Sequence, residues 1–114
     1  MSFDFFLNPL FLSGFIFALL GFIMYKFPPK EINSLYGYRT GNSMESQEKW
    51  DFSQRYAAVL LIKTGLIFCT LSFLRLFIKI NEGILIIIET AILLIGAIFL
   101  IYKTEKAIKN KFEK

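Results

Sequence analysis

Apolar residues fill three long stretches of this 114-residue chain, and polar residues gather between them. The first apolar stretch, residues 9–27, contains one serine and, near its end, one lysine. At about 1.5 Å per residue a helix of this length covers roughly 28 Å, close to the hydrocarbon thickness of a bilayer. Asn8 is a suitable N-cap before Pro9, and Pro28 and Pro29 stop a helix. The pattern therefore predicts a membrane-spanning helix.

Two further predicted spans, residues 55–78 and 83–103, carry Lys63 and Glu89 inside their apolar runs. In the last span about thirteen Ile, Leu and Phe residues each contribute roughly −0.3 to −0.6 kcal/mol to insertion, whereas one acid costs about 2.5–3.5 kcal/mol. The apolar contribution is the larger, and the more polar middle span is expected to insert with it as a hairpin. Because the connection at 79–82 is short, these two helices should be antiparallel neighbours.

The composition indicates a membrane protein rather than a soluble enzyme. A hydrophobic content of 55% and a mean hydropathy of +0.55 are too apolar for a soluble domain of this size. The single cysteine, Cys69, excludes a disulfide within the chain, and histidine, the commonest general base and metal ligand, is absent. We therefore expect no enzymatic activity, no catalytic residue, no metal and no cofactor. The net charge of +4 lies mainly near the C-terminus, which indicates anionic lipid rather than nucleic acid as the partner.

The predicted fold is an all-α membrane domain over residues 1–114, with three transmembrane helices, a structured cytoplasmic loop at 28–54 and a basic tail at 104–114. Lysine and arginine counts predict the orientation, because short cytoplasmic segments are enriched in both. Two of these residues, Arg75 and Lys79, lie on one side of the membrane, and ten lie on the other: Lys26, Lys30, Arg39, Lys49, Arg55, Lys103, Lys106, Lys109, Lys111 and Lys114. We expect a multi-pass protein of the plasma membrane with its N-terminus outside and its C-terminus in the cytoplasm.

A few polar and small residues within the spans carry specific expectations. Arg75 and Glu89 lie at similar distances from the short connection, so in an antiparallel hairpin they should be level and within ion-pair reach. This pair is either a staple between two helices or part of a ligand or proton site. Lys63 either extends its flexible stem to the interface or faces a polar cavity beside the loop. Gly14 and Gly21 lie on one face of the first helix and predict close helix packing.

The segment between the first two spans is longer and more distinctive than a plain linker. Glycines flank Tyr38, Arg39 and Thr40 and allow positive φ angles there. An arginine in such a turn, beside hydroxyl groups, is suited to a phosphate or a carboxylate. The structural alternative is that Arg39 only anchors the loop, to lipid phosphates or to Glu45. Asn42, followed three residues later by Glu45, is a capping-box pattern that predicts the start of a helix.

The same loop resembles the signature of the SdpI family of bacterial membrane proteins. The signature combines an asparagine, a glycine-aromatic-arginine-threonine stretch, a serine and a tryptophan at the next span, and this chain matches it with Asn33, Tyr36, Gly37, Tyr38, Arg39, Thr40, Ser43, Met44, Glu48 and Trp50. The resemblance covers residues 9–75 and differs from the family in two respects. The founding type is longer, with further spans before this unit, and the family often has proline where Gly41 stands.

Members similar to the founding type give immunity to a secreted killing peptide, a form of bacteriocin resistance, and relay its presence to a repressor. The resemblance implies a non-enzymatic immunity or envelope-protection protein of the cell membrane that binds a membrane-active peptide or a lipid headgroup through Asn33, Tyr38, Arg39, Thr40, Ser43 and Trp50. Its expected partners are the lipid bilayer, either a toxin peptide or a cytoplasmic regulator, and further copies of the chain in a homo-oligomer. The alternative is a small transporter or flippase unit, built from several copies because three helices enclose little space, that uses Lys63, Arg75 and Glu89.

Overall fold

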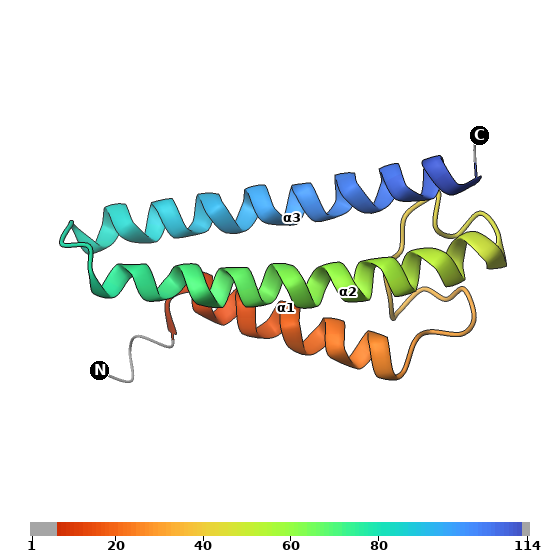
Figure 1. The fold of residues 1–114 in the computed structure, drawn as a ribbon, viewed down its shortest axis with the longest axis horizontal. Coiled ribbons are helices and arrows are strands. Elements are labelled where there is room, and N and C mark those ends of the chain that lie inside the picture. Colours follow the sequence, from red (N-terminus) through yellow and green to blue (C-terminus); the bar gives the residue numbers. More distant parts are fainter. Residues whose placement is uncertain (1–6, 113–114) are drawn as a thin grey trace.

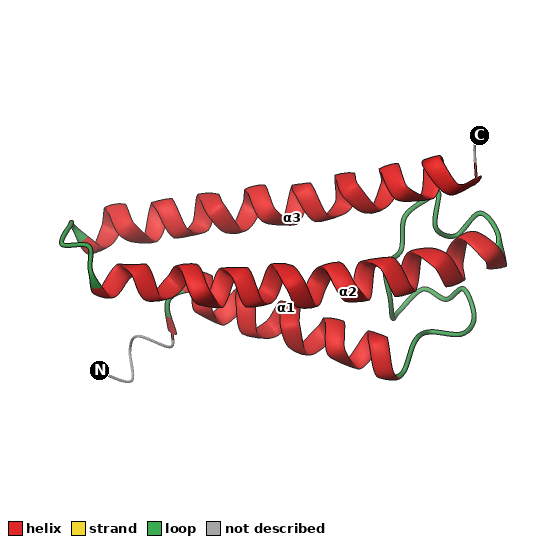
Figure 2. Ribbon diagram, viewed as in Figure 1, coloured by secondary structure: helices red, strands yellow, loops and turns green. Residues whose placement is uncertain are grey.

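The computed structural model describes residues 7–112 as three long helices, with no strand among these residues. The helices are α1 (Pro9–Lys26), α2 (Gln47–Ser72), which continues into a 3₁₀ turn at Phe73–Leu76, and α3 (Glu82–Phe112). They lie side by side along the long axis of a molecule measuring 49 × 27 × 20 Å (Figures 1 and 2). Each is long and apolar enough to cross a membrane, which confirms the predicted all-α architecture of three helices with the length and composition of membrane spans.

The N-terminal caps confirm one prediction and correct another. Asn8 caps α1, since its Oδ1 accepts a hydrogen bond of 2.8 Å from the backbone N–H of Phe11. The capping box predicted at Asn42 is wrong, because α2 begins at Gln47 and its N-cap is Ser46, whose Oγ accepts from the backbone of Lys49. The Asn42 side chain is instead used in a contact with α3.

The helices extend beyond the predicted spans at the end where the loop lies. Residues 47–54, predicted as loop, form the first two turns of α2, and α3 continues through most of the predicted tail to Phe112. Both segments lack glycine and proline and are rich in good helix formers. Each also buries an inward face, with Trp50 and Gln54 on α2 and Ile108 on α3. Glu113 and Lys114 of the predicted tail lie outside the described residues.

Small residues allow α1 and α2 to approach closely, which confirms the prediction made from the position of Gly14 and Gly21 on one face of the first helix. A Cβ atom added to Gly14 would lie 2.7 Å from the carbonyl oxygen of Gly65, and one added to Gly65 would lie 2.5 Å from the backbone of Ala18. Gly21 meets the carbonyl oxygen of Ala58 in the same way. Since backbone atoms cannot move aside cheaply, only glycine fits at these three contacts.

Most large apolar side chains point outward rather than into the bundle. In the most apolar 18-residue stretch of α3 only 17% of the residues are buried. Side chains such as Phe15, Ile87 and Ile95 are more than half exposed. In water this surface would be unfavourable, whereas in lipid it is already in an apolar solvent. The arrangement therefore fits a membrane protein whose helices pack through small residues and a few polar contacts.

Candidate functional site

The loop between α1 and α2 is folded against α2 through two side chains of that helix. Trp50 is fully buried, and its indole Nε1–H donates a hydrogen bond of 2.7 Å to the carbonyl oxygen of Pro29. One turn earlier, the Gln47 amide donates to the carbonyl oxygen of Lys30 at 2.6 Å. The first turns of α2 therefore fix the chain where it leaves α1, and Trp50 acts inside the protein rather than as an interfacial anchor.

Gln54 holds the centre of the loop because its side-chain amide pairs with both backbone polar groups of Tyr38. Its Oε1 accepts from the N–H of Tyr38, and its Nε2 donates to the carbonyl oxygen of the same residue, both at 2.6 Å. Gly37 has φ +111°, and a Cβ there would lie 2.5 Å from Gln54 Oε1 and 2.7 Å from Pro29 Cγ. Glycine is thus required at 37 both by the backbone conformation and by the space available.

Glu105 of α3 receives three hydrogen bonds from the loop. The hydroxyls of Tyr38 and Thr40 donate to its Oε2 at 2.6 and 2.8 Å, and the Asn42 amide donates to its Oε1 at 2.9 Å. Burial raises the pKa of the Tyr38 hydroxyl, and the neighbouring carboxylate raises it further. The hydroxyl therefore remains a donor at physiological pH, and one carboxylate ties the loop to α3.

Two further predicted site residues stabilise the loop from within. Ser43 is fully buried, and its Oγ accepts from the N–H of Thr40 at 2.8 Å while lying 3.1 Å from the carbonyl oxygens of Tyr38 and Thr40. Asn33 closes a turn, because its Oδ1 accepts from the backbone N–H groups of Leu35 and Tyr36. Both side chains thus have their polar atoms engaged in the fold of the loop.

Arg39 differs from its neighbours in this loop. Its side chain is exposed, and no hydrogen bond or ion pair joins it to any residue in the 7–112 range. The expected alternative partner, Glu45, pairs with Lys49 at 2.8 Å, so the anchoring of Arg39 to Glu45 is wrong. The structure therefore presents an unpaired guanidinium on a segment whose flanking residues, Tyr38 and Thr40, are both held by Glu105.

The charged residues within the spans occupy two separate places. Arg75 donates from Nε and Nη2 to the two oxygens of Glu89 at 3.0 and 2.9 Å, which confirms the predicted pair. The Arg75 side chain is 13% exposed and that of Glu89 is 4% exposed, and Arg75 also reaches Glu82 at 3.0 Å. This geometry favours the staple between α2 and α3. Lys63 is exposed and lines a groove between the same two helices, without a contribution from the loop.

Sequence reasoning missed Gln54 and Glu105, the two residues that place the loop. Glu105 is the sole acid among the lysines of residues 103–112, which was the available signal. Gln54 gave no such signal, since its role depends on a partner backbone far along the chain. Within the described residues, no group of three His, Cys, Asp or Glu side chains is placed to hold a metal ion.

Comparison with known proteins gives one family and one relative. The model described as "SdpI/YfhL protein family" matches residues 30–103, which include most of the loop, α2 and most of α3. The chain is 35% identical over 97 residues to "Uncharacterized protein YfhL" of Bacillus subtilis (strain 168), and the alignment covers 85% of this chain and 83% of that protein. No solved structure matches the chain. The matched region thus includes Gln47, Trp50 and Gln54, the α2 residues that hold the loop, whereas Pro29 and Glu105 lie just outside it.

Proposed function

This chain belongs to the SdpI/YfhL protein family, and on that basis we propose that it is a non-enzymatic protein that protects the cell envelope against a membrane-active peptide. Immunity is the role that the resemblance to the founding type implies. The contact surface in this proposal is the face of the loop that carries Arg39. An anionic group of the peptide, a carboxylate or its C-terminus, would be the partner of the guanidinium.

The unpaired state of Arg39 is the observation that carries the proposal. Five of the six predicted loop residues have structural partners, so their chemistry is already accounted for by the fold. Arg39 has none among the described residues, although the residues on both sides of it are fixed. A guanidinium on a rigid segment loses less conformational entropy when it binds an anion than one on a mobile chain.

The proposal also includes an orientation, with the loop and the basic end of α3 in the cytoplasm. The loop and the C-terminal part of α3 lie together at one end of the bundle (Figure 1), and Tyr38 and Glu105 join them. The turn between α2 and α3, which carries Lys79, lies at the opposite end. The two segments that are rich in lysine and arginine are therefore on the same side, which supports the orientation inferred from charge counts.

The test is survival of cells that express the protein and are challenged with membrane-active antibacterial peptides. We expect Arg39→Gln to lose protection and Arg39→Lys to retain only part of it, because an ammonium group lacks the planar fork of donors. Lys26→Gln, which removes one exposed positive charge at the end of α1, is the matched control and should protect like the parent protein. Full protection by Arg39→Gln at parental abundance on immunoblots would refute the proposal. A fall in abundance would contradict the placement of Arg39 as a surface residue.

A further inference from the structure

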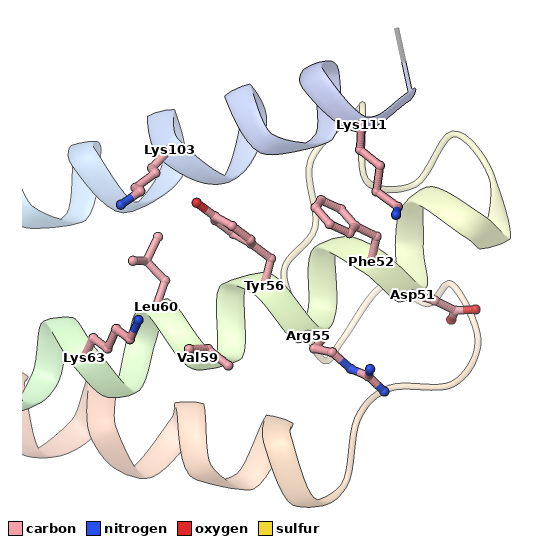
Figure 3. A pocket seen from close by; sticks show the side chains of 9 residues that line it. All are labelled: Asp51, Phe52, Arg55, Tyr56, Val59, Leu60, Lys63, Lys103 and Lys111. Atoms are coloured by element: carbon pink, nitrogen blue, oxygen red, sulfur yellow. The ribbon is translucent and has the colours of Figure 1, made fainter. Parts of the chain in front are cut away.

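A groove of about 600 Å³ lies between α2 and α3 near the loop end of the bundle (Figure 3). Nine residues line it, and they are either basic or apolar with the exceptions of one carboxylate and one phenol: Asp51, Phe52, Arg55, Tyr56, Val59, Leu60, Lys63, Lys103 and Lys111. We propose that this groove binds one anionic phospholipid of the adjacent leaflet, with its phosphate between Lys63 and Lys103 and an acyl chain along Val59 and Leu60.

The charge of the groove complements a phosphate diester. Four of the nine lining side chains are cationic and one is anionic. Arg55, Lys63, Lys103 and Lys111 form no ion pair with any residue between 7 and 112, and the one acid, Asp51, already accepts a hydrogen bond of 2.8 Å from Gln47. Lys103 and Lys111 do lie over the rings of Phe99 and Phe52, at 5.7 and 5.3 Å, but these contacts leave their charge uncompensated. Positive charges without an acidic partner among the described residues attract the anionic lipids of a membrane surface.

The register of the two helices arranges these cations in two tiers. The Arg75–Glu89 ion pair and the contact of the Phe52 and Phe112 rings, with centroids 5.8 Å apart, fix α2 against α3. In this register Lys63 is within one helical turn of Lys103 in depth. Arg55 and Lys111 are each eight residues away on their helices, about 12 Å further along the axis at 1.5 Å per residue. Each tier thus has one cation from each helix.

The tier formed by Lys63 and Lys103 lies at the depth of a lipid phosphate. Lys103 directly follows the apolar run of α3, which ends at Tyr102, and Lys63 is within the apolar part of α2. Their flexible stems can place both ammonium groups at the membrane–water boundary. Tyr56 extends from α2 towards α3, with its hydroxyl in the gap between the helices, while Val59 and Leu60 continue the groove as an apolar wall (Figure 3). A headgroup and the start of an acyl chain are accommodated together.

The groove is separate from the Arg39 surface. On α2, Tyr56 lines the groove whereas Gln54 holds the loop. On α3, Lys103 lines the groove whereas Glu105 holds the loop. Residues two apart on an α-helix point about 200° away from each other. The groove and the docked loop therefore lie on opposite faces of the α2–α3 pair, so either proposal can fail without the other.

The test is lipid retention by the full-length protein, measured by native mass spectrometry after incubation in mixed micelles. The probes are dioleoyl phosphatidylglycerol and dioleoyl phosphatidylcholine, which share acyl chains and differ in net charge. We expect one phosphatidylglycerol per chain in clear preference to phosphatidylcholine. The double variant Lys63→Gln/Lys103→Gln should bind it about thirtyfold more weakly, because each basic side chain near anionic lipid contributes roughly fivefold.

The matched control is Lys106→Gln/Lys109→Gln, which removes two charges from α3 outside the groove. It should change binding less than twofold, and the charge-preserving double variant Lys63→Arg/Lys103→Arg should retain it. Equal losses in the two glutamine variants would show diffuse attraction to a basic segment and overturn the proposal. Equal retention of the two lipids, or complete displacement by glycerol phosphate without acyl chains, would also overturn it.

Discussion

Replacing Glu105 by alanine should release the loop from α3 while leaving the three helices intact. The carboxylate accepts hydrogen bonds from Tyr38, Thr40 and Asn42 at 2.6–2.9 Å. A hydrogen bond to a charged group contributes about 1.5–3 kcal/mol when protected from water. Glu105 is only half-buried and its partners regain water when it is removed, so we expect a loss of about 2–4 kcal/mol in loop docking rather than the full sum. Local opening of the loop would become about 30-fold more frequent or more.

Hydrogen–deuterium exchange of the protein in lipid nanodiscs measures this opening. The backbone N–H groups of Tyr38 and Thr40 donate to Gln54 and Ser43, so their exchange reports on whether the loop is folded. Exchange over residues 38–44 should accelerate at least tenfold in Glu105→Ala and remain at the parental rate in the apolar part of α3. The control is Glu48→Ala, which removes the same charge from an exposed residue that forms no ion pair with any residue between 7 and 112. Unchanged exchange in Glu105→Ala would refute the reasoning that this carboxylate holds the loop.

Three further predictions concern helix packing, the buried ion pair and pH. Gly65→Ala should lower the midpoint of thermal unfolding in detergent, by a loss of about 1–3 kcal/mol, because its Cβ meets the backbone of α1, whereas Gly41→Ala, with open space around it, should have little effect. Glu89→Leu should destabilise by about 3 kcal/mol or more because it leaves Arg75 largely buried without its main partner, and the double variant Arg75→Leu/Glu89→Leu should recover most of that loss in the same assay. Since the pKa of Tyr38 is raised in the folded state, its contribution is complete below the ordinary tyrosine pKa of about 10 and is lost only at higher pH, so the part of the tyrosinate absorbance that Tyr38→Phe removes should appear only above about pH 10.

The parts of the structure that follow from local rules were predictable from the sequence. Three apolar runs of sufficient length predicted three helices, because lipid requires every backbone group to be paired within the segment. The Arg75–Glu89 pair was predictable because a short turn between antiparallel helices sets the depth of residues on both sides. Gly14 and Gly21 indicated close packing because they share one face of α1.

The docking of the loop was not predictable in the same way, since it depends on residues far apart in the chain. Asn42 was predicted as the N-cap from the local pattern, but its side chain donates to Glu105 of another helix, and Ser46 caps α2 instead. Trp50 was predicted as part of a ligand-binding surface, yet it is buried and its indole N–H donates to Pro29. In both cases a hydrogen-bond partner distant in the sequence, rather than the local pattern, fixes the side chain.

Site-directed cysteine labelling in intact cells tests the central claim most directly, because the proposed function places the loop end of the bundle, with the Arg39 surface, in the cytoplasm. Single cysteines are placed at Gly41, which has open space around it, and at the exposed Ile80, in a Cys69→Ala background. With a membrane-impermeant maleimide we predict labelling of Ile80→Cys in intact cells and of Gly41→Cys only after the membrane is permeabilised. Labelling of Gly41→Cys from outside, with Ile80→Cys protected, would contradict the account.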